Sequence, residues 1–143
     1  INNRMTAKYD LTLNKGSSYD LWLQYLSDGN TGINLSGYDA QFQIKKYRGD
    51  SNTILFVSET GVRYGCTGDI TTTGIAGDGQ ISMNKNYDGT GLTGGMYVKV
   101  DATTTSKLPD GNWFYDVQLT STSGVNSVNR ILEGKIRISP GVN

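Results

Sequence analysis

Carboxylates are the side chains of this sequence whose positions first suggest chemistry. Asp20, Asp39, Asp116 and Glu133 each fall at an outward position of a predicted β-strand, so two of them can share one sheet face. A pair of carboxyl groups about 5 to 10 Å apart can hydrolyse a glycosidic bond. Because thirteen acidic residues on any β-sandwich produce such pairs by chance, we interpret these residues as a solvated face. A minimal glycosidase is our third hypothesis.

The sequence contains no histidine and a single cysteine, Cys66. Without histidine there is no Ser-His-Asp or Cys-His pair and no imidazole general base, and the commonest zinc and copper ligand is missing. We therefore expect no conventional hydrolase or metalloenzyme site. One cysteine forms no internal disulfide and no CxxC pair, so the fold must depend on burial and hydrogen bonds. We interpret Cys66 as an incidental free thiol.

Three segments rich in aspartate and glycine, SDGNTG, AGDGQ and NYDGTG, offer oxygen atoms that a cation could use. None of them matches the calcium loop of an EF-hand, and their Asp-Gly pairs are those of ordinary turns. The sequence also has no GxxxxGK[ST] segment, so we expect no phosphate-binding loop of that type. We predict no metal and no cofactor.

Aromatic residues are the second candidate for function, because exposed tyrosine and tryptophan rings stack on sugars or bases. Most of the aromatic residues fall on the inward face of a predicted strand and are better interpreted as core. Trp22 and Phe114 are out of phase with the apolar residues of their strands, so they either lie under a loop or an adjacent subunit or form a binding platform. The partner-binding residues that we predict are Trp22, Phe114, Tyr64, Tyr87 and Tyr97.

Charge and hydropathy exclude two classes of partner. Thirteen basic and thirteen acidic residues give a formal net charge of zero, so there is no overall positive field to attract nucleic acid or anionic membranes. The longest apolar runs, such as ILFV at 54–57, are far shorter than the roughly 20 residues that cross a bilayer. The chain begins at Ile1 without the apolar stretch of a secretory signal, so we expect none in this sequence.

Apolar and polar residues alternate with a period of two along most of the chain, and helical spacing is almost absent. In the segment 38–46, Tyr38, Ala40, Phe42 and Ile44 face one way and the polar residues between them face the other. Similar alternation predicts further strands near 8–14, with Tyr9, Leu11 and Leu13 inward, and near 18–26, 53–59, 79–84, 95–101, 113–119 and 130–138. About eight short strands separated by Asp-Gly and Pro-Asp-Gly turns predict an all-β antiparallel sandwich or barrel.

The 143 residues suffice for one domain that buries about two-thirds of its unfolded surface. One helical turn is expected at 101–107, where Asp101 can cap the free amides and Pro109 prevents continuation.

Residues 61–94 are rich in glycine and threonine, which predicts long loops or a flat hairpin that extends beyond the core. We favour an ordered projection held by a partner over disorder, and we interpret residues 1–8 as an N-terminal arm.

Two segments carry a more specific pattern. The first contains a glycine, an aromatic-led strand, a D-G turn, an aliphatic-Leu-Ser-Gly-Tyr step and a strand that ends in basic residues. Its residues are Gly16, Tyr19, Asp28, Gly29, Ile33, Leu35, Ser36, Gly37, Tyr38, Gln43, Ile44 and Lys45. The second contains Leu-Pro-x-Gly, an aromatic Tyr-Asp strand, a Ser-Gly turn, an Arg-aliphatic-Leu-x-Gly strand and a final proline. Its residues are Leu108, Pro109, Gly111, Tyr115, Asp116, Leu119, Ser123, Gly124, Arg130, Leu132, Glu133, Gly134 and Pro140.

In order and spacing, these segments resemble a family of small virion proteins of contractile-tailed bacteriophages, including those of cyanobacteria. The resemblance covers about 7–60 and 95–143 and leaves 61–94 outside the pattern. It implies an immunoglobulin-like β-sandwich without catalytic residues, assembled in many copies into tail, baseplate, neck or capsid-surface structures. A neutral chain permits such copies to pack closely without mutual repulsion.

Our leading hypothesis is a non-enzymatic structural protein located in a phage virion, whose partners are other copies of itself and other virion proteins. The alternative is a carbohydrate-binding module or host-adsorption domain in which Trp22, Tyr64, Tyr87 or Tyr97 stacks on a host-surface glycan.

Overall fold

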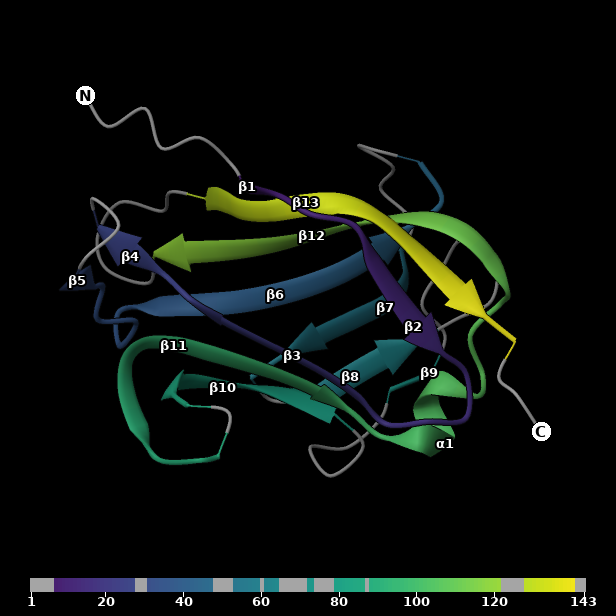
Figure 1. Cartoon of the computed structure of the whole chain (residues 1–143), viewed down its shortest axis with the longest axis horizontal. Coiled ribbons are helices and arrows are strands. Elements are labelled where there is room, and N and C mark those ends of the chain that lie inside the picture. Colours follow the sequence, from purple (N-terminus) through teal and green to yellow (C-terminus); the bar gives the residue numbers. More distant parts are fainter. Residues whose placement is uncertain are drawn as a thin grey trace.

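Two β-sheets packed face to face form the protein (Figure 1). The computed structural model describes residues 7–27, 31–47, 53–59, 61–64, 72–73, 79–86, 88–121 and 128–140. The larger sheet has the order β1 (Ala7–Lys8), β13 (Val128–Ser139), β12 (Gly111–Ser121), β6 (Tyr38–Lys45), β7 (Thr53–Ser58), β8 (Gly61–Tyr64) and β9 (Thr72–Thr73), and β2 (Leu11–Asn14) also pairs with β13. The smaller sheet has the order β10 (Gly79–Lys85), β11 (Gly91–Val100) and β3 (Tyr19–Gln24). A short pair, β4 (Leu26–Ser27) and β5 (Thr31–Gly32), lies at one end (Figure 1).

The strand order is that of an immunoglobulin-like sandwich. The strands β13, β12, β6, β7 and β8 follow one another in one sheet and β3, β11 and β10 in the other, as in domains of the variable type. All long strands pair antiparallel, whereas β1 and β2 run parallel to β13. The predicted all-β immunoglobulin-like sandwich is therefore confirmed. The strands of four or more residues include the eight that were predicted and add β8.

Alternation along β6 and β12 places the core between the sheets. Phe42 is fully buried, and its ring centroid lies 6.3 Å from that of Tyr19 and 5.8 Å from that of Tyr115. These three rings join the two sheets without a disulfide. The other buried apolar residues are Leu13, Leu35, Ala40, Ile44, Ile54, Leu55, Val57, Ile81, Met96, Val98, Val100, Leu108, Val117, Leu119, Ile136 and Ile138.

The N-terminal strand is interrupted at Tyr9, and the inward position predicted for this residue is wrong. Tyr9 is 64% exposed, whereas Leu13 is buried as predicted. The interruption has its own hydrogen bonds. The Tyr115 hydroxyl donates to the carbonyl of Tyr9, and the Asp10 carboxylate accepts from the backbone N–H of residue 135 at 3.0 Å. Because these contacts hold the chain in an irregular conformation, the phase of the alternation is lost between β1 and β2.

The described part of 61–94 contributes strands to both sheets, and the glycine-rich residues 65–71 and 74–78 lie outside the described residues. The strand β8 extends the larger sheet beside β7, and β10 pairs with β11 along most of its length. Ile81 of β10 is buried in the core. The apolar alternation of Ile81 and Met83 is sufficient to build this segment into the sandwich despite its glycine-rich flanks. Cys66 and Tyr87 lie outside the described residues.

Two local predictions are confirmed. The helix α1 (Ala102–Thr105) begins after Asp101, whose carboxylate accepts from the backbone N–H of Thr104 at 2.9 Å. At the predicted Asp88-Gly89 turn, Gly89 has φ +88° and donates its N–H to the carbonyl of Asn86 at 2.9 Å. The Asp28-Gly29 turn and Asp78 of the Asp78-Gly79 pair lie outside the described part. No helix in the described part is long and apolar enough to span a membrane.

Asn84 organises a bulge in β10. Its backbone has φ +56°, and its Oδ1 accepts from the N–H groups of Leu35 at 3.0 Å and Gly94 at 3.1 Å. Its Nδ2 donates to Asn34 Oδ1 at 3.1 Å and Ser36 Oγ at 3.3 Å. One side chain thus ties β10 to β11 and to the segment that precedes β6.

Candidate functional site on the outer face of the larger sheet

The outer face of the larger sheet carries three rungs of directly opposed side chains, which together we call the polar ladder. The first rung runs Lys135, Phe114, Lys45 across β13, β12 and β6. The second runs Glu133, Asp116, Gln43, Phe56 and reaches β7. The third runs Arg130, Gln118, Gln41, Ser58. The ladder therefore gathers amide, carboxylate and cationic groups and two phenylalanines on one face.

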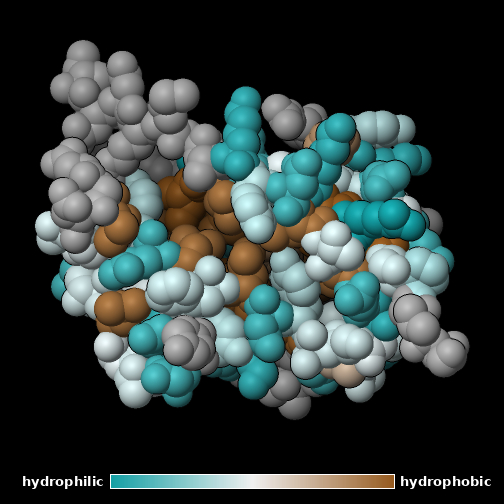
Figure 2. Space-filling model, in the orientation of Figure 1, coloured by the Kyte–Doolittle hydropathy of each residue, from teal (hydrophilic) through white to brown (hydrophobic). Residues whose placement is uncertain are grey.

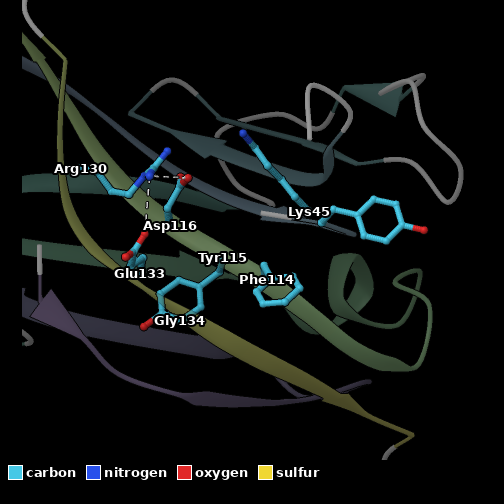
Figure 3. A pocket seen from close by; sticks show the side chains of 8 residues that line it. Lys45, Phe114, Tyr115, Asp116, Arg130, Glu133 and Gly134 are labelled. Atoms are coloured by element: carbon cyan, nitrogen blue, oxygen red, sulfur yellow. Dashed lines mark ion pairs between the residues drawn. The ribbon is translucent and has the colours of Figure 1, made fainter. Parts of the chain in front are cut away.

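The middle rung is buried although it lies on an outer face. Asp116 is 7% exposed and Gln43 is 8% exposed. Arg130 reaches both acidic groups, with Nε 3.4 Å from Asp116 Oδ2 and Nη1 3.5 Å from Glu133 Oε1 (Figure 3). Gln118 Nε2 also donates to Asp116 Oδ2, at 3.4 Å. A simple solvated face does not bury its charged groups in this way.

Asp116 has one satisfied and one unsatisfied oxygen. Its Oδ1 is buried and has no hydrogen-bond partner among the described residues. Asp116 lines a hollow of about 10 Å³, together with Lys45, Phe114, Arg130 and Glu133. Burial raises the pKa of Asp116, and Glu133 raises it further, while Lys45 and Arg130 act in the opposite direction. The hollow is large enough for about one water-sized group.

The structure brings together only one of the predicted carboxylate pairs. Asp116 and Glu133 are directly opposed on β12 and β13, whereas Asp20 lies on the other sheet. Asp39 does not line the hollow beside Asp116 but lies at a second depression farther along the same face. Because the hollow beside Asp116 and Glu133 holds about one small group, a sugar ring does not fit between these carboxylates as a glycosidase requires. The described residues contain no cluster of three potential metal ligands.

A shallow depression of about 260 Å³ continues the ladder across β6 and β7. It shares Gln41, Phe56 and Ser58 with the ladder. Glu59 lies at its border, where its Oε1 accepts from the backbone N–H of Ala40 at 3.2 Å and burial raises the pKa of its carboxyl group. The outer face is therefore hollowed beyond the immediate surroundings of Asp116.

Two of the predicted aromatic residues lie on the opposite side of the molecule. Trp22 and Tyr97 are directly opposed on the outer face of the smaller sheet, and Trp22 is 37% exposed. The Trp22 Nε1 donates to the carbonyl of Lys85 at 3.2 Å, so this ring also secures the bulged end of β10. Burial raises the pKa of Tyr97, with a further contribution from Asp20. Phe114 belongs to the other sheet, so these predicted residues do not form one site.

For the two remaining predicted tyrosines, the structure gives no side-chain position. Tyr87 and the side chain of Tyr64 lie outside the described residues. The sequence reasoning also missed the glutamines of the ladder, Gln41, Gln43 and Gln118. Their signal was present in the sequence, because Gln41 and Gln43 of β6 and Gln118 of β12 stand at outward positions of their strands.

A third surface feature is an apolar seam beside β3. Figure 2 shows a band of hydrophobic residues, which in the orientation of Figure 1 runs between β13 and β2 on one side and β3 on the other. In the described part of the chain, β3 pairs with β11 alone, since β1 and β2 pair with β13. We call this edge and its border the β3 seam. The half-buried hydrophobic residues of β3 itself are Tyr19, Leu21 and Leu23.

Comparison with known proteins gives similarity at the level of structure alone. No family model and no curated protein matches the chain. Among solved structures, murine CRIg is 14% identical with a TM-score of 0.43, over 90% of this chain and 91% of that chain. A chain from a structure of T cell specificity and activation by the superantigen toxic shock syndrome toxin-1 is 12% identical with a TM-score of 0.46, over 90% and 92%. A voltage-gated sodium channel beta4 extracellular domain is 11% identical with a TM-score of 0.37, over 99% of both chains. Similarities of this size carry no argument about function.

Proposed function

We propose that this protein is a non-enzymatic structural component of a bacteriophage virion and that it assembles with copies of itself through the β3 seam. The observation that carries the proposal is that β3 lies at the end of the smaller sheet and carries half-buried hydrophobic side chains. The resemblance of residues 7–60 and 95–143 to virion proteins supports the same role.

The chemistry of the seam favours a protein partner. An edge strand presents backbone N–H and C=O groups that a strand of a neighbouring subunit can pair with. Leu21 and Leu23 of β3 are half-buried and pack against the core, so a neighbour would remove their remaining apolar surface from water. Copies of a chain with zero net charge approach one another without overall repulsion.

Trp22 and Tyr97 fit the same interface. Both lie on the smaller sheet, and Trp22 belongs to the edge strand itself. We therefore assign them to the subunit contact and not to a separate glycan platform. Assembly through β3 should reduce the exposure of the Trp22 ring.

Sedimentation of the purified protein over a range of concentrations tests the proposal. The protein should form discrete oligomers, and Leu21→Lys should shift it toward monomers because a charge now borders the edge. The long lysine side chain can reach water from a half-buried position, so the domain should remain folded. Thr12→Lys is the matched control, since Thr12 is exposed and on the opposite side of β2 from Leu13. Protein that stays monomeric at high concentration, or oligomers that both variants affect equally, would contradict the proposal.

A further inference from the structure

We propose that the polar ladder binds a neutral saccharide, with one hydroxyl group in the hollow beside Asp116 and a ring face against Phe114. The site lies on the larger sheet, away from the Trp22 and Tyr97 positions of the smaller sheet. It does not depend on assembly through the β3 seam. Three features of the ladder support this site: the unsatisfied carboxylate oxygen, the local charge balance and the arrangement of the rungs.

The unsatisfied oxygen requires a hydrogen-bond donor. Asp116 is more than nine-tenths buried, and its Oδ1 has no partner in the described structure. A buried carboxylate oxygen without a partner costs free energy, and a ligand that donates to it recovers that cost. Because the hollow has a volume of about 10 Å³, the donor must be small, and a single hydroxyl group has the right size.

The charges around the hollow favour a neutral ligand. Asp116 and Glu133 are balanced by Arg130 and Lys45, all four of which line the hollow (Figure 3). An ammonium or guanidinium group that approached Asp116 would also meet the two cationic side chains. An anion would meet the two carboxylates. A hydroxyl group avoids both penalties.

The rest of the ladder can recognise the remaining hydroxyl groups of a sugar. Each glutamine amide offers an acceptor and two donors, and sugar hydroxyl groups both donate and accept. The amides are also aligned by mutual contact, since Gln43 Nε2 donates to Gln41 Oε1 at 3.3 Å and Gln118 contacts Asp116. Fixed polar groups of this kind set the orientation of a bound ligand.

The two phenylalanines are half-buried, and each can offer its remaining apolar surface to a sugar. Phe114 lies between Lys45 and Lys135 in the first rung and also lines the hollow. Phe56 lies two strands away, roughly 10 Å across the sheet, at the depression of about 260 Å³. The ladder therefore accommodates an oligosaccharide better than a single sugar ring.

A variant of the ladder and a control variant on the smaller sheet test the site. The probes are neutral oligosaccharides of hexoses and N-acetylhexosamines, first on a glycan array and then in an NMR titration at millimolar concentration. Amide resonances near Phe114 and Asp116 should shift on binding. Phe114→Leu should weaken binding by at least about fivefold, since it removes the aromatic ring, whereas Lys99→Ala, at an exposed position of the smaller sheet, should leave the affinity unchanged.

A second variant tests the hollow itself. Asp116→Asn keeps the shape of the side chain but replaces a charge-assisted hydrogen bond by a neutral one, so the affinity should fall by about tenfold. Removing a buried charge of raised pKa should not prevent folding. The absence of any array signal and of any NMR shift would overturn the proposal. An affinity that Lys99→Ala lowers and Phe114→Leu leaves intact would also overturn it.

Discussion

Replacement of Asn84 by alanine should be among the most destabilising single changes in this domain. The side chain accepts hydrogen bonds from the N–H groups of Leu35 and Gly94, which both belong to buried residues. Each buried N–H that loses its acceptor costs about 1–3 kcal/mol. Alanine at φ +56° adds a conformational cost of about 1–2 kcal/mol. The free energy of unfolding should therefore fall by at least roughly 3 kcal/mol.

Two further variants at this position separate the contributions. Asn84→Gly loses the same hydrogen bonds but tolerates a positive φ, so it should be about 1 kcal/mol more stable than the alanine variant. Asn84→Asp keeps the acceptor oxygen and loses the donors to Asn34 and Ser36, so it should be the least affected. Urea unfolding followed by tryptophan fluorescence measures all three.

Hydrogen exchange gives a local readout for the same variants. The amides of Leu35 and Gly94 should exchange faster in the alanine and glycine variants than in the aspartate variant. The reasoning is refuted if the alanine variant unfolds within about 0.5 kcal/mol of the parent protein, or if glycine and aspartate give equal stability.

Three other predictions concern stability. In Gly134→Ala the new Cβ would lie 2.1 Å from the carbonyl oxygen of Tyr9, so the free energy of unfolding should fall by roughly 1–3 kcal/mol. Urea unfolding measures this change, and an unchanged midpoint would contradict the close packing of the N-terminal strand. Tyr115→Phe removes the hydroxyl that donates to this same carbonyl, which should cost about 1–2 kcal/mol and speed hydrogen exchange in β1, whereas unaltered exchange would count against the contact. For Asp116, a raised folded-state pKa means that its stabilising contribution is complete below the unfolded-state pKa and is lost as pH rises through the folded-state value. The Asp116→Asn variant should therefore become more stable relative to the parent protein as pH rises through this window. A trend in the opposite direction would contradict the raised pKa of Asp116.

Sequence alternation predicted the strands that have one apolar and one polar face. The strand β6 is the clearest example, because Ala40, Phe42 and Ile44 are all buried as expected. The cap of α1 by Asp101 was predictable for a similar reason, since it depends on residues close in sequence. Local patterns therefore account for most of the two sheets.

The interruption at Tyr9 was not predictable from a local pattern. It depends on the hydroxyl of Tyr115 and on the absence of a side chain at Gly134, and both residues are more than one hundred positions away. Alternation alone extends a strand through such a position. Contacts distant in sequence decided the conformation.

The candidate site was predicted in part. Asp116 and Glu133 were assigned to outward positions, but their direct opposition depends on the register of β12 against β13, which shifts at a bulge between Val117 and Gln118. Trp22 and Phe114 were both assigned outward positions, yet they lie on different sheets. Alternation indicates which side chains point away from the core, but it does not indicate which sheet a strand joins.

The most direct test of assembly into a virion is quantitative mass spectrometry of purified phage particles from the source of this sequence. Our account predicts peptides of this chain in intact particles, at a copy number comparable with that of other structural proteins and resistant to washing with salt. The account is contradicted if the protein is produced during infection but is absent from purified particles.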